Sequence, residues 1–217
     1  MSDMFDTIDA APLDREAERI LRLNDRGGYT VPTEGLYPYQ WNWDSAFAGL
    51  GFAAFDIDRA WTEIETLFTG QWENGMVPHI LFHRADPGYF PGPEVWGTEE
   101  ALGRGACRVP SSGISQPPVV AALAWRIYEA DREAGQARLA TLFPKLVAYY
   151  RWVMAARAES GAVAISHPWG AGRGHGPGWG AAMAGAEAPG GAAQTRAGTG
   201  PRGGGAGGRA VRVRRES

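Results

Sequence analysis

The segment Asp44-Ser-Ala-Phe-Ala-Gly-Leu-Gly-Phe-Ala-Ala-Phe55 decides the fold class of this 217-residue chain. It is almost wholly apolar, and Asp44 stands where a helix N-cap belongs, so it predicts a buried helix that its two internal glycines weaken. Asp56 or Asp58 then begins another helix, because apolar residues recur three or four positions apart as far as Phe68. No alternating strand pattern of useful length is present, so we expect an all-α fold.

The sequence before and after this pair of helices is also informative. Apolar residues at Ile20, Leu21 and Leu23 follow a charged run and predict an amphipathic helix that ends at Gly27-Gly28. Residues 70–113 combine glycine, proline and aromatic residues without a sustained period. A structured loop of that length usually has a function beyond connecting two helices.

Helical patterns return in the second half of the chain. Ser115 is expected to cap a helix that has Pro117 and Pro118 in its first turn. A short helical segment follows, and Pro144 is expected to begin a last helix that runs to about Ala158. We therefore expect separate helices on the two sides of Pro144.

Composition divides the chain near residue 170. Residues 171–217 hold 15 of the 31 glycines, with seven basic and two acidic side chains. Residues 1–170 hold 14 basic and 22 acidic side chains and every aromatic residue except Trp179. We therefore expect residues 1–170 to form one globular unit and residues 171–217 to be a disordered tail rich in glycine and arginine.

Several classes of protein are disfavoured by simple sequence features. The N-terminus is acidic and lacks the basic region and apolar core of a signal peptide, and no run approaches 18 apolar residues. The single Cys107 excludes an internal disulfide framework. We expect a cytoplasmic protein without a membrane partner, and the acidic front part argues against nucleic acid as its partner.

The densest chemical information lies in Tyr37-Pro-Tyr-Gln-Trp-Asn-Trp-Asp44. Aromatic rings can pack against the C–H faces of a sugar ring, while amide and carboxylate groups bind its hydroxyls. Gln71–His79 and Tyr89–Trp96 repeat this mixture of residues. The sequence therefore predicts a carbohydrate site; the alternative is that the two tryptophans are core residues and Asp44 is only a helix cap.

Other kinds of chemistry have weaker support. His79 and His83 stand at i and i+4, as zinc ligands on a helix can, but Pro78 and the lack of a third ligand disfavour a metal site. We interpret His79 as a packing residue of the loop. Cys107 has no paired histidine nearby, and no glycine-rich phosphate loop follows a strand. We therefore expect neither a metal ion nor an organic cofactor.

Taken together, five ordered motifs resemble bacterial glycoside hydrolases of the mannosylglycerate and glucosylglycerate hydrolase type. They are Tyr37–Phe47, Gln71–His79, Tyr89-Phe-Pro-Gly-Pro, Ser112-Gly-Ile-Ser-Gln-Pro-Pro118 and His167-Pro-Trp169. The resemblance implies an (α/α)6 toroid of paired helices and inverting hydrolysis of an α-glycosidic bond. It also implies that the residues which hold the nonreducing sugar are Tyr37, Trp41, Trp43, Asp44, Tyr89 and Gln116.

The catalytic positions depart from this family's pattern. In the family, the general acid is the first residue of an Asp-Asn-Ser-Pro sequence, and Gly174 occupies that position here. The second carboxylate, a Glu, would lie beyond the end of this chain. Inverting hydrolysis needs two carboxyl groups roughly 6.5–9.5 Å apart. We therefore expect the chain to be inactive unless two of the carboxylates in the aromatic loops, Asp44, Glu73, Asp86 and Glu94, form a substitute pair.

The helices that the sequence predicts are too few for six helix pairs. Residues 1–170 would then be the N-terminal part of a catalytic domain, an incomplete toroid that leaves apolar surface without a packing partner. We hypothesise that residues from about 170 onward are a degraded or frame-shifted end. Two alternatives remain: a non-catalytic carbohydrate-binding module, or a nucleic-acid binder that uses the arginines of residues 203–215. The oligomeric state is not predicted by the sequence.

Overall fold

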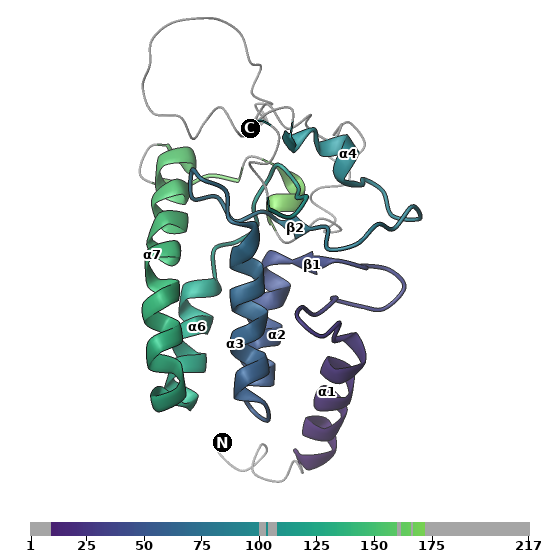
Figure 1. Ribbon diagram of the computed structural model, residues 1–217, viewed down its shortest axis with the longest axis vertical. Helices are drawn as coiled ribbons and strands as arrows, with labels where there is room; N and C mark the ends of the chain where they lie inside the picture. Colours follow the sequence, from purple (N-terminus) through teal and green to yellow (C-terminus); the bar gives the residue numbers. More distant parts are fainter. Residues whose placement is uncertain (1–9, 100–102, 104–107, 160–161, 166, 172–217) are drawn as a thin grey trace, which may run out of the picture.

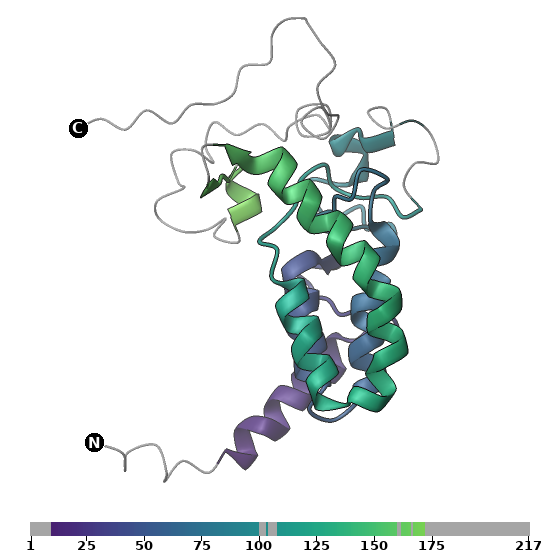
Figure 2. The same ribbon diagram turned by 90° about the vertical axis from the view of Figure 1, so that its left-hand side faces the viewer.

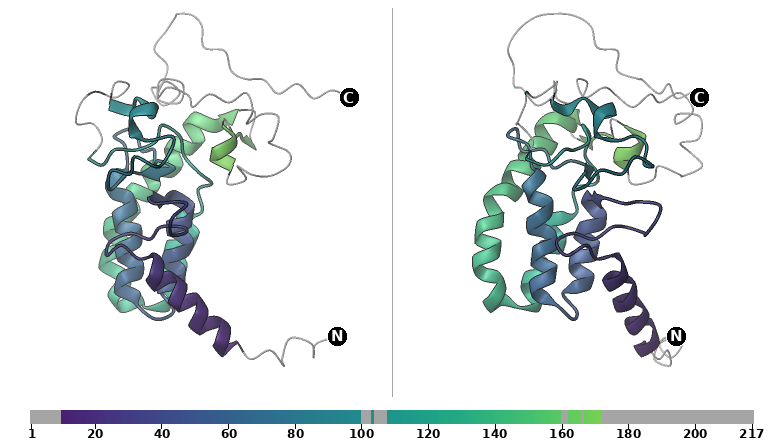
Figure 3. Two further views of the ribbon diagram at one scale, coloured as in Figure 1. Left: turned by 90° about the vertical axis from the view of Figure 1, so that its right-hand side faces the viewer. Right: turned by 45° about the vertical axis from the view of Figure 1, so that its right-hand side comes forward.

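The computed structural model describes residues 10–99, 103, 108–159, 162–165 and 167–171. Four helices in this part of the chain lie side by side (Figures 1 and 2): α2 (Asn42–Phe52), α3 (Ile57–Leu67), α6 (Val120–Ala130) and α7 (Arg132–Arg157). The helix α1 (Ala11–Asn24) contacts α2 at the edge of this group (Figure 3). The first helix therefore ends before Gly27-Gly28, as predicted.

Short elements gather at one end of the helices (Figure 1). Strand β1 (Gln40–Trp41) pairs antiparallel with β2 (Ile80–Leu81), and β3 (Ala158–Glu159) pairs antiparallel with β4 (Ala162–Val163). The remaining elements are α4 (Pro93–Trp96) and two 3-10 turns, η1 (Phe68–Gly70) and η2 (Pro168–Ala171). The described chain is mostly helical, which agrees with the all-α expectation, and it also contains two strand pairs of two residues each. Membership in a closed (α/α)6 toroid stays a prediction.

The start of α2 differs from the prediction. Trp41 occupies the N-cap position, and Asp44 lies inside the first turn. The reason is tertiary: β1 pairs with β2 up to Trp41, and the backbone N–H of Asn42 then donates to the carbonyl of His79 at 3.0 Å. The strand pair thus fixes where the helix begins, and the prediction of Asp44 as the N-cap is wrong.

Of the caps predicted for two other helices, one is confirmed and one is wrong. The side chain of Asp56, one of the two residues predicted to begin this helix, accepts a hydrogen bond from the backbone N–H of Arg59 at 3.0 Å and caps α3. Ser115 does not cap α6, which begins at Val120. Its hydroxyl instead donates to the carbonyl of Val77 at 2.7 Å, so a buried partner from another loop replaced the expected local contact.

A single 26-residue helix, α7, replaces the two helices expected around Pro144. A proline inside a helix removes one backbone hydrogen bond and costs about 3 kcal/mol or more. Leu142 and Leu146 are buried on either side of it, and Tyr149 is fully buried one turn further on. Packing on both sides of Pro144 therefore outweighs the local cost and keeps the helix continuous.

The main hydrophobic core lies between α2, α3, α6 and α7. Gly49 of α2 explains their close approach: a Cβ there would lie 3.0 Å from Cδ1 of Ile64 and 3.3 Å from the carbonyl oxygen of Ala60. Gly49, one of the two glycines that weaken α2 as an isolated helix, therefore lets α3 pack tightly on it. A second cluster, the aromatic cluster, lies beside β1 and β2 and comprises Tyr39, Trp41, Ile80, Phe82, Trp96 and Ile114.

A buried carboxylate joins the helices to the strands. Glu63 of α3 is fully buried. It accepts hydrogen bonds from side chains of α2, α3, β1 and the loop after α1: Ser45 Oγ at 2.5 Å, Arg59 Nη2 at 2.8 Å, Gln40 Nε2 at 3.1 Å and Thr30 Oγ1 at 2.8 Å. Arg59 also pairs with Asp25 at 2.8 Å. Both oxygens of Glu63 therefore have partners.

Some large apolar side chains face solvent in the described part of the chain. Ile20 and Leu23 of α1 are about half exposed, as are Phe47 of α2 and Trp125 of α6, and Phe143 of α7 is more exposed. Contiguous exposed apolar surface commonly marks a contact with another part of a protein. None of the helices in the described ranges is both long enough and apolar enough to span a membrane.

Replacement of Glu63 tests the importance of its network for stability. Glu63→Ala leaves Arg59 buried with fewer anionic partners, and we expect the free energy of unfolding to fall by about 3–5 kcal/mol. The control is Glu129→Ala, which removes an exposed pair with Arg126 and should cost less than about 1 kcal/mol. Urea unfolding followed by tryptophan fluorescence measures both changes. Equal losses in the two variants would contradict the assignment.

Candidate functional site

A cavity of about 720 Å³ lies where β1, β2 and the start of α2 meet the long loops. All six residues predicted to hold a sugar line it: Tyr37, Trp41, Trp43, Asp44, Tyr89 and Gln116. They come from segments as far apart in sequence as residues 37 and 116, and only the fold brings them together. Their role in binding a ligand stays a prediction.

Aromatic rings form one wall of the cavity. The ring of Trp41 meets that of Tyr37 edge to face at a centroid distance of 5.2 Å and that of Tyr89 at 5.7 Å. Trp41 is only 6 % exposed and belongs to the aromatic cluster, so it is a core residue that also borders the cavity. Trp43 is less buried and faces the ring of Phe47 at 6.0 Å.

The polar groups of the site converge at the start of α2. The backbone N–H of Trp43 donates to Oε1 of Gln116 at 3.1 Å. This N–H lies in the first turn of the helix, where no helical carbonyl can reach it. Because the Gln116 side chain uses its oxygen there, its amide NH₂ is the group it can offer to a ligand.

Asp44 is a half-buried carboxyl group in the cavity wall. Burial raises the pKa of Asp44 from 3.8 to about 6, and hydrogen bonds from its own backbone N–H and the Trp43 side chain oppose that rise. Asp44 is thus largely ionised at neutral pH and can accept hydrogen bonds from hydroxyl groups.

Two further wall residues, His79 and Trp169, were not among the predicted site residues. His79 is buried, its Nδ1 lies 3.2 Å from Oγ of Ser112, and burial lowers its pKa to about 3, with a smaller contribution from His167. It is therefore a neutral imidazole in the cavity wall as well as the packing residue that was expected. The sequence feature that could have identified His79 as a site residue is its place in the Gln71–His79 motif.

His83 lies apart from His79 and has its own partners. Its Nε2 is 2.7 Å from Oε1 of Gln40, its ring stacks on Tyr29 at 4.2 Å, and burial lowers its pKa to about 4. The two histidines lie outside the helices. Among the described residues, no three His, Cys, Asp or Glu side chains gather as a metal site.

The other proposed catalytic positions do not meet at the cavity. Glu73, Asp86 and Glu94 are not among the described residues that line it, and Asp44 is the one carboxylate in that set. Cys107 and Gly174 lie outside the described residues, as does most of the segment from 171 to 217. The tail, its boundary near residue 170 and its proposed disorder stay predictions.

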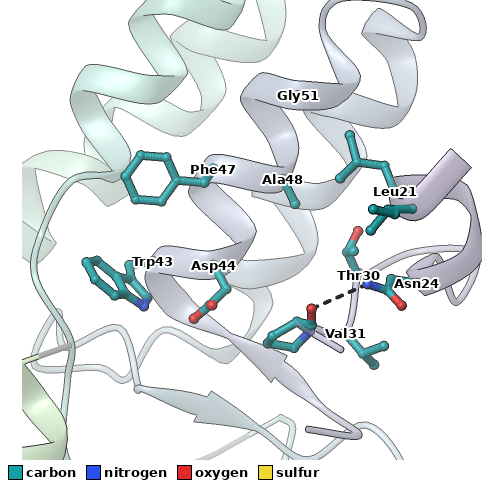
Figure 4. A pocket seen from close by; sticks show the side chains of 11 residues that line it. Leu21, Asn24, Thr30, Val31, Trp43, Asp44, Phe47, Ala48 and Gly51 are labelled. Atoms are coloured by element: carbon teal, nitrogen blue, oxygen red, sulfur yellow. Dashed lines mark hydrogen bonds between the residues drawn. The ribbon is translucent and has the colours of Figure 1, made fainter. Parts of the chain in front are cut away.

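A second hollow of about 460 Å³ lies between α1 and α2 (Figure 4). Leu21 and Val31 approach it from the side of α1 and the following loop, and Phe47 approaches it from α2 (Figure 4). Trp43 and Asp44 border both this hollow and the larger cavity. The hydrogen bond drawn in Figure 4 joins Nδ2 of Asn24 to the carbonyl of Pro32 at 3.3 Å.

Comparison with known proteins identifies the family. Residues 37–216 match the model of the mannosylglycerate hydrolase MGH1-like glycoside hydrolase domain. The chain belongs to this family of glycoside hydrolases. The match reaches beyond residue 170 into the segment interpreted above as degraded or frame-shifted.

Relatives and solved structures agree with this assignment. Mannosylglycerate hydrolase MGH2 of Selaginella moellendorffii is 46 % identical over 184 residues, which are 83 % of this chain and 36 % of that protein. Glucosylglycerate hydrolase of Mycolicibacterium hassiacum is 37 % identical over 177 residues, with 77 % and 40 % covered. The chain therefore spans about two fifths of the length of these relatives.

The family fold is also seen in crystal structures of GH63 mannosylglycerate hydrolase from Thermus thermophilus. The complex with Tris and D-glycerate has a TM-score of 0.70 at 47 % identity, over 80 % of this chain and 41 % of that chain. The complex with glucose has a TM-score of 0.64 at 45 % identity over the same shares. The solved relative thus binds small polar ligands.

The raised pKa of Asp44 predicts a pH-dependent contribution to stability. The folded protein holds this proton more tightly than the unfolded chain, so the contribution is fully present below pH 4 and is lost as the pH rises to about 6. We expect the stability of the wild type relative to Asp44→Asn to fall across this interval and then stay constant.

Urea unfolding of both proteins at several pH values from 4 to 7 measures this difference. His79 and His83, whose lowered pKa values act with the opposite sign in the same interval, are present in both proteins and cancel. A difference that stays flat from pH 4 to 6 would contradict the assigned pKa of Asp44.

Proposed function

We propose that the cavity binds the nonreducing sugar ring of a small glycoside, with mannosylglycerate or glucosylglycerate as the substrate class. The observation that carries this proposal is the convergence of aromatic rings with Asp44, Gln116 and His79 in one cavity. Its volume of about 720 Å³ falls in the usual range for small-ligand sites, about 300–1,000 Å³. The names of the family's characterised members support the same substrate class.

The proposed division of roles follows from the chemistry of each wall. Trp43 and Tyr37 offer apolar ring surface to the C–H groups of the sugar. Asp44, ionised above pH 6, accepts hydrogen bonds from two hydroxyl groups, while the amide NH₂ of Gln116 donates one. A neutral His79 can donate through one ring nitrogen and accept through the other.

We propose further that this 217-residue chain binds the sugar without hydrolysing its glycosidic bond. Hydrolysis needs an acid that protonates the leaving oxygen and a base that activates water, and each contributes typically 10²–10⁴-fold. Asp44 is the one carboxylate among the described cavity residues. A glycine stands at position 174, where the family resemblance implies the general acid.

Substitution of Trp43 tests the binding proposal. Trp43→Ala removes an aromatic surface of the cavity, and we expect the dissociation constant for glucosylglycerate or mannosylglycerate to rise about two- to tenfold, since aromatic contacts contribute about 0.5–1.5 kcal/mol. Trp125→Ala is the matched control, because Trp125 is half exposed on α6 and lies outside the cavity lining. Calorimetric titration measures both; unchanged affinity in Trp43→Ala would remove the site assignment.

Hydrolysis assays test the second proposal. We expect purified protein that binds the sugar to release no glycerate from glucosylglycerate or mannosylglycerate, and no phenol from an activated aryl α-glucoside, above the buffer blank. Turnover that disappears in Asp44→Asn would show that the chain does contain a working acid–base pair. Binding without turnover is also the result that the non-catalytic binding module predicts.

A further inference from the structure

The hydroxyl of Tyr149 lies behind the cavity, where three segments of its wall meet. Tyr149 belongs to α7, is fully buried and is not among the residues that line the cavity. The three segments are the start of α2, residues 77–79 and residues 115–116. Each of them contains or adjoins a cavity residue: Trp43, His79 or Gln116.

The phenol oxygen contacts two of these segments directly. It lies 2.8 Å from Oγ of Ser115, donates to the carbonyl of Gln116 at 3.2 Å and accepts from Nδ2 of Asn42 at 3.4 Å. Residues 77–79 are linked to the phenol oxygen indirectly, because Ser115 and Asn42, which both contact it, also donate to the carbonyl of Val77, at 2.7 Å and 3.2 Å. The amide of Asn42 also reaches the carbonyl of Pro78 at 3.2 Å.

The direction of these hydrogen bonds follows from their partners. The carbonyl of Val77 can only accept, so the single hydroxyl proton of Ser115 points to it. Tyr149 must then donate its own proton toward Ser115 and Gln116, while it accepts from the amide of Asn42. Burial raises the pKa of Tyr149, which keeps this proton in place at ordinary pH.

We propose that Tyr149 is a positioning residue of the cavity, whose hydroxyl fixes Gln116 relative to the start of α2. Gln116 held in this way places its side-chain oxygen 3.1 Å from the backbone N–H of Trp43 and leaves its amide NH₂ toward the cavity. The same hydroxyl holds Asn42, the residue before Trp43. The consequence for sugar affinity rests on the proposed function, whereas the positioning of Trp43 does not.

Loss of the Tyr149 hydroxyl should therefore change the local structure around Trp43 and Gln116 as well as the overall stability. In Tyr149→Phe the buried ring remains stacked near Trp152, with 6.4 Å between centroids in the wild type, but the carbonyl of Gln116 loses the proton that it accepts from the phenol. The amide of Asn42 keeps the carbonyls of Val77 and Pro78 as acceptors. An unsatisfied buried polar group costs about 1–3 kcal/mol and favours rearrangement of the segments around it. Trp43, joined to Gln116 by one hydrogen bond, is where that rearrangement should be detected.

The neighbouring tyrosine provides a matched control. Tyr150 is half-buried on the same helix, and its hydroxyl donates to the carbonyl of Pro118 and accepts from the backbone N–H of Ala121 at 3.3 Å. These partners lie at the start of α6. Tyr150→Phe therefore removes a hydroxyl of the same kind from the same helix without touching Asn42, Ser115 or Gln116.

The first measurement needs no ligand. Hydrogen exchange of the Trp43 backbone amide, followed by NMR on the full chain, should be about tenfold faster in Tyr149→Phe than in the wild type, while amides in the middle of α3 keep near wild-type rates. In Tyr150→Phe the Trp43 amide should exchange at the wild-type rate, and the loss should be confined to the neighbourhood of Ala121, whose backbone N–H donates to the Tyr150 hydroxyl. Equal acceleration at Trp43 and throughout α3 would indicate a general loss of stability and overturn the proposal. Unchanged exchange at Trp43 would also overturn it.

The second measurement is calorimetric titration with glucosylglycerate and mannosylglycerate. We expect about tenfold weaker sugar binding in Tyr149→Phe and unchanged binding in Tyr150→Phe. Equal affinities in Tyr149→Phe and the wild type would refute the proposal that Tyr149 affects sugar binding. A wild type that binds neither glycoside refutes the proposed function, and the exchange experiment then decides the positioning role alone. If Tyr149→Phe does not fold, Ser115→Ala removes one partner of the hydroxyl, and unchanged Trp43 exchange there would contradict the proposal.

Discussion

The carboxylate of Glu63 is the constraint on which the arrangement of the described chain depends. A charge with no solvent exposure must have its hydrogen bonds satisfied, and the donors come from α2, α3, β1 and the loop after α1. Because Gln40 is one of them, strand β1 is fixed against α3, and Trp41 and Asn42 follow directly in sequence. The helical core thereby determines where one wall of the cavity lies.

Two hydrogen-bond networks hold the segments that form the site. The Glu63 network anchors β1 through Gln40, and the Tyr149 network anchors residues 115–116 and the start of α2 through Asn42. The pairing of β1 with β2 brings His79 to the same place. The cavity is thus built mainly from loops, but the helices α3 and α7 supply the groups that position them.

Membership of the glycoside hydrolase family gives these features a common explanation. The chain spans about two fifths of the length of its relatives, and it contains the motifs that line the cavity. Trp43 and Asp44 border both the cavity and the apolar hollow beside α1. The residues predicted to hold a sugar therefore meet in this part of the chain, and Asp44 is the one carboxylate among the described cavity residues.

The sequence by itself determined the mostly helical character, a helix that begins at Asp56 or Asp58, and the family, because helical periodicity, a local capping contact and ordered motifs are all encoded by neighbouring residues. Only the tertiary structure decided the start of α2, the role of Ser115 and the continuity of α7 through Pro144. In each case a partner distant in sequence outweighed the local preference: the pairing with β2, the carbonyl of Val77, or packing against the core. The same reason applies to His79, since a residue's place in a cavity wall depends on chain segments that its own neighbours do not specify.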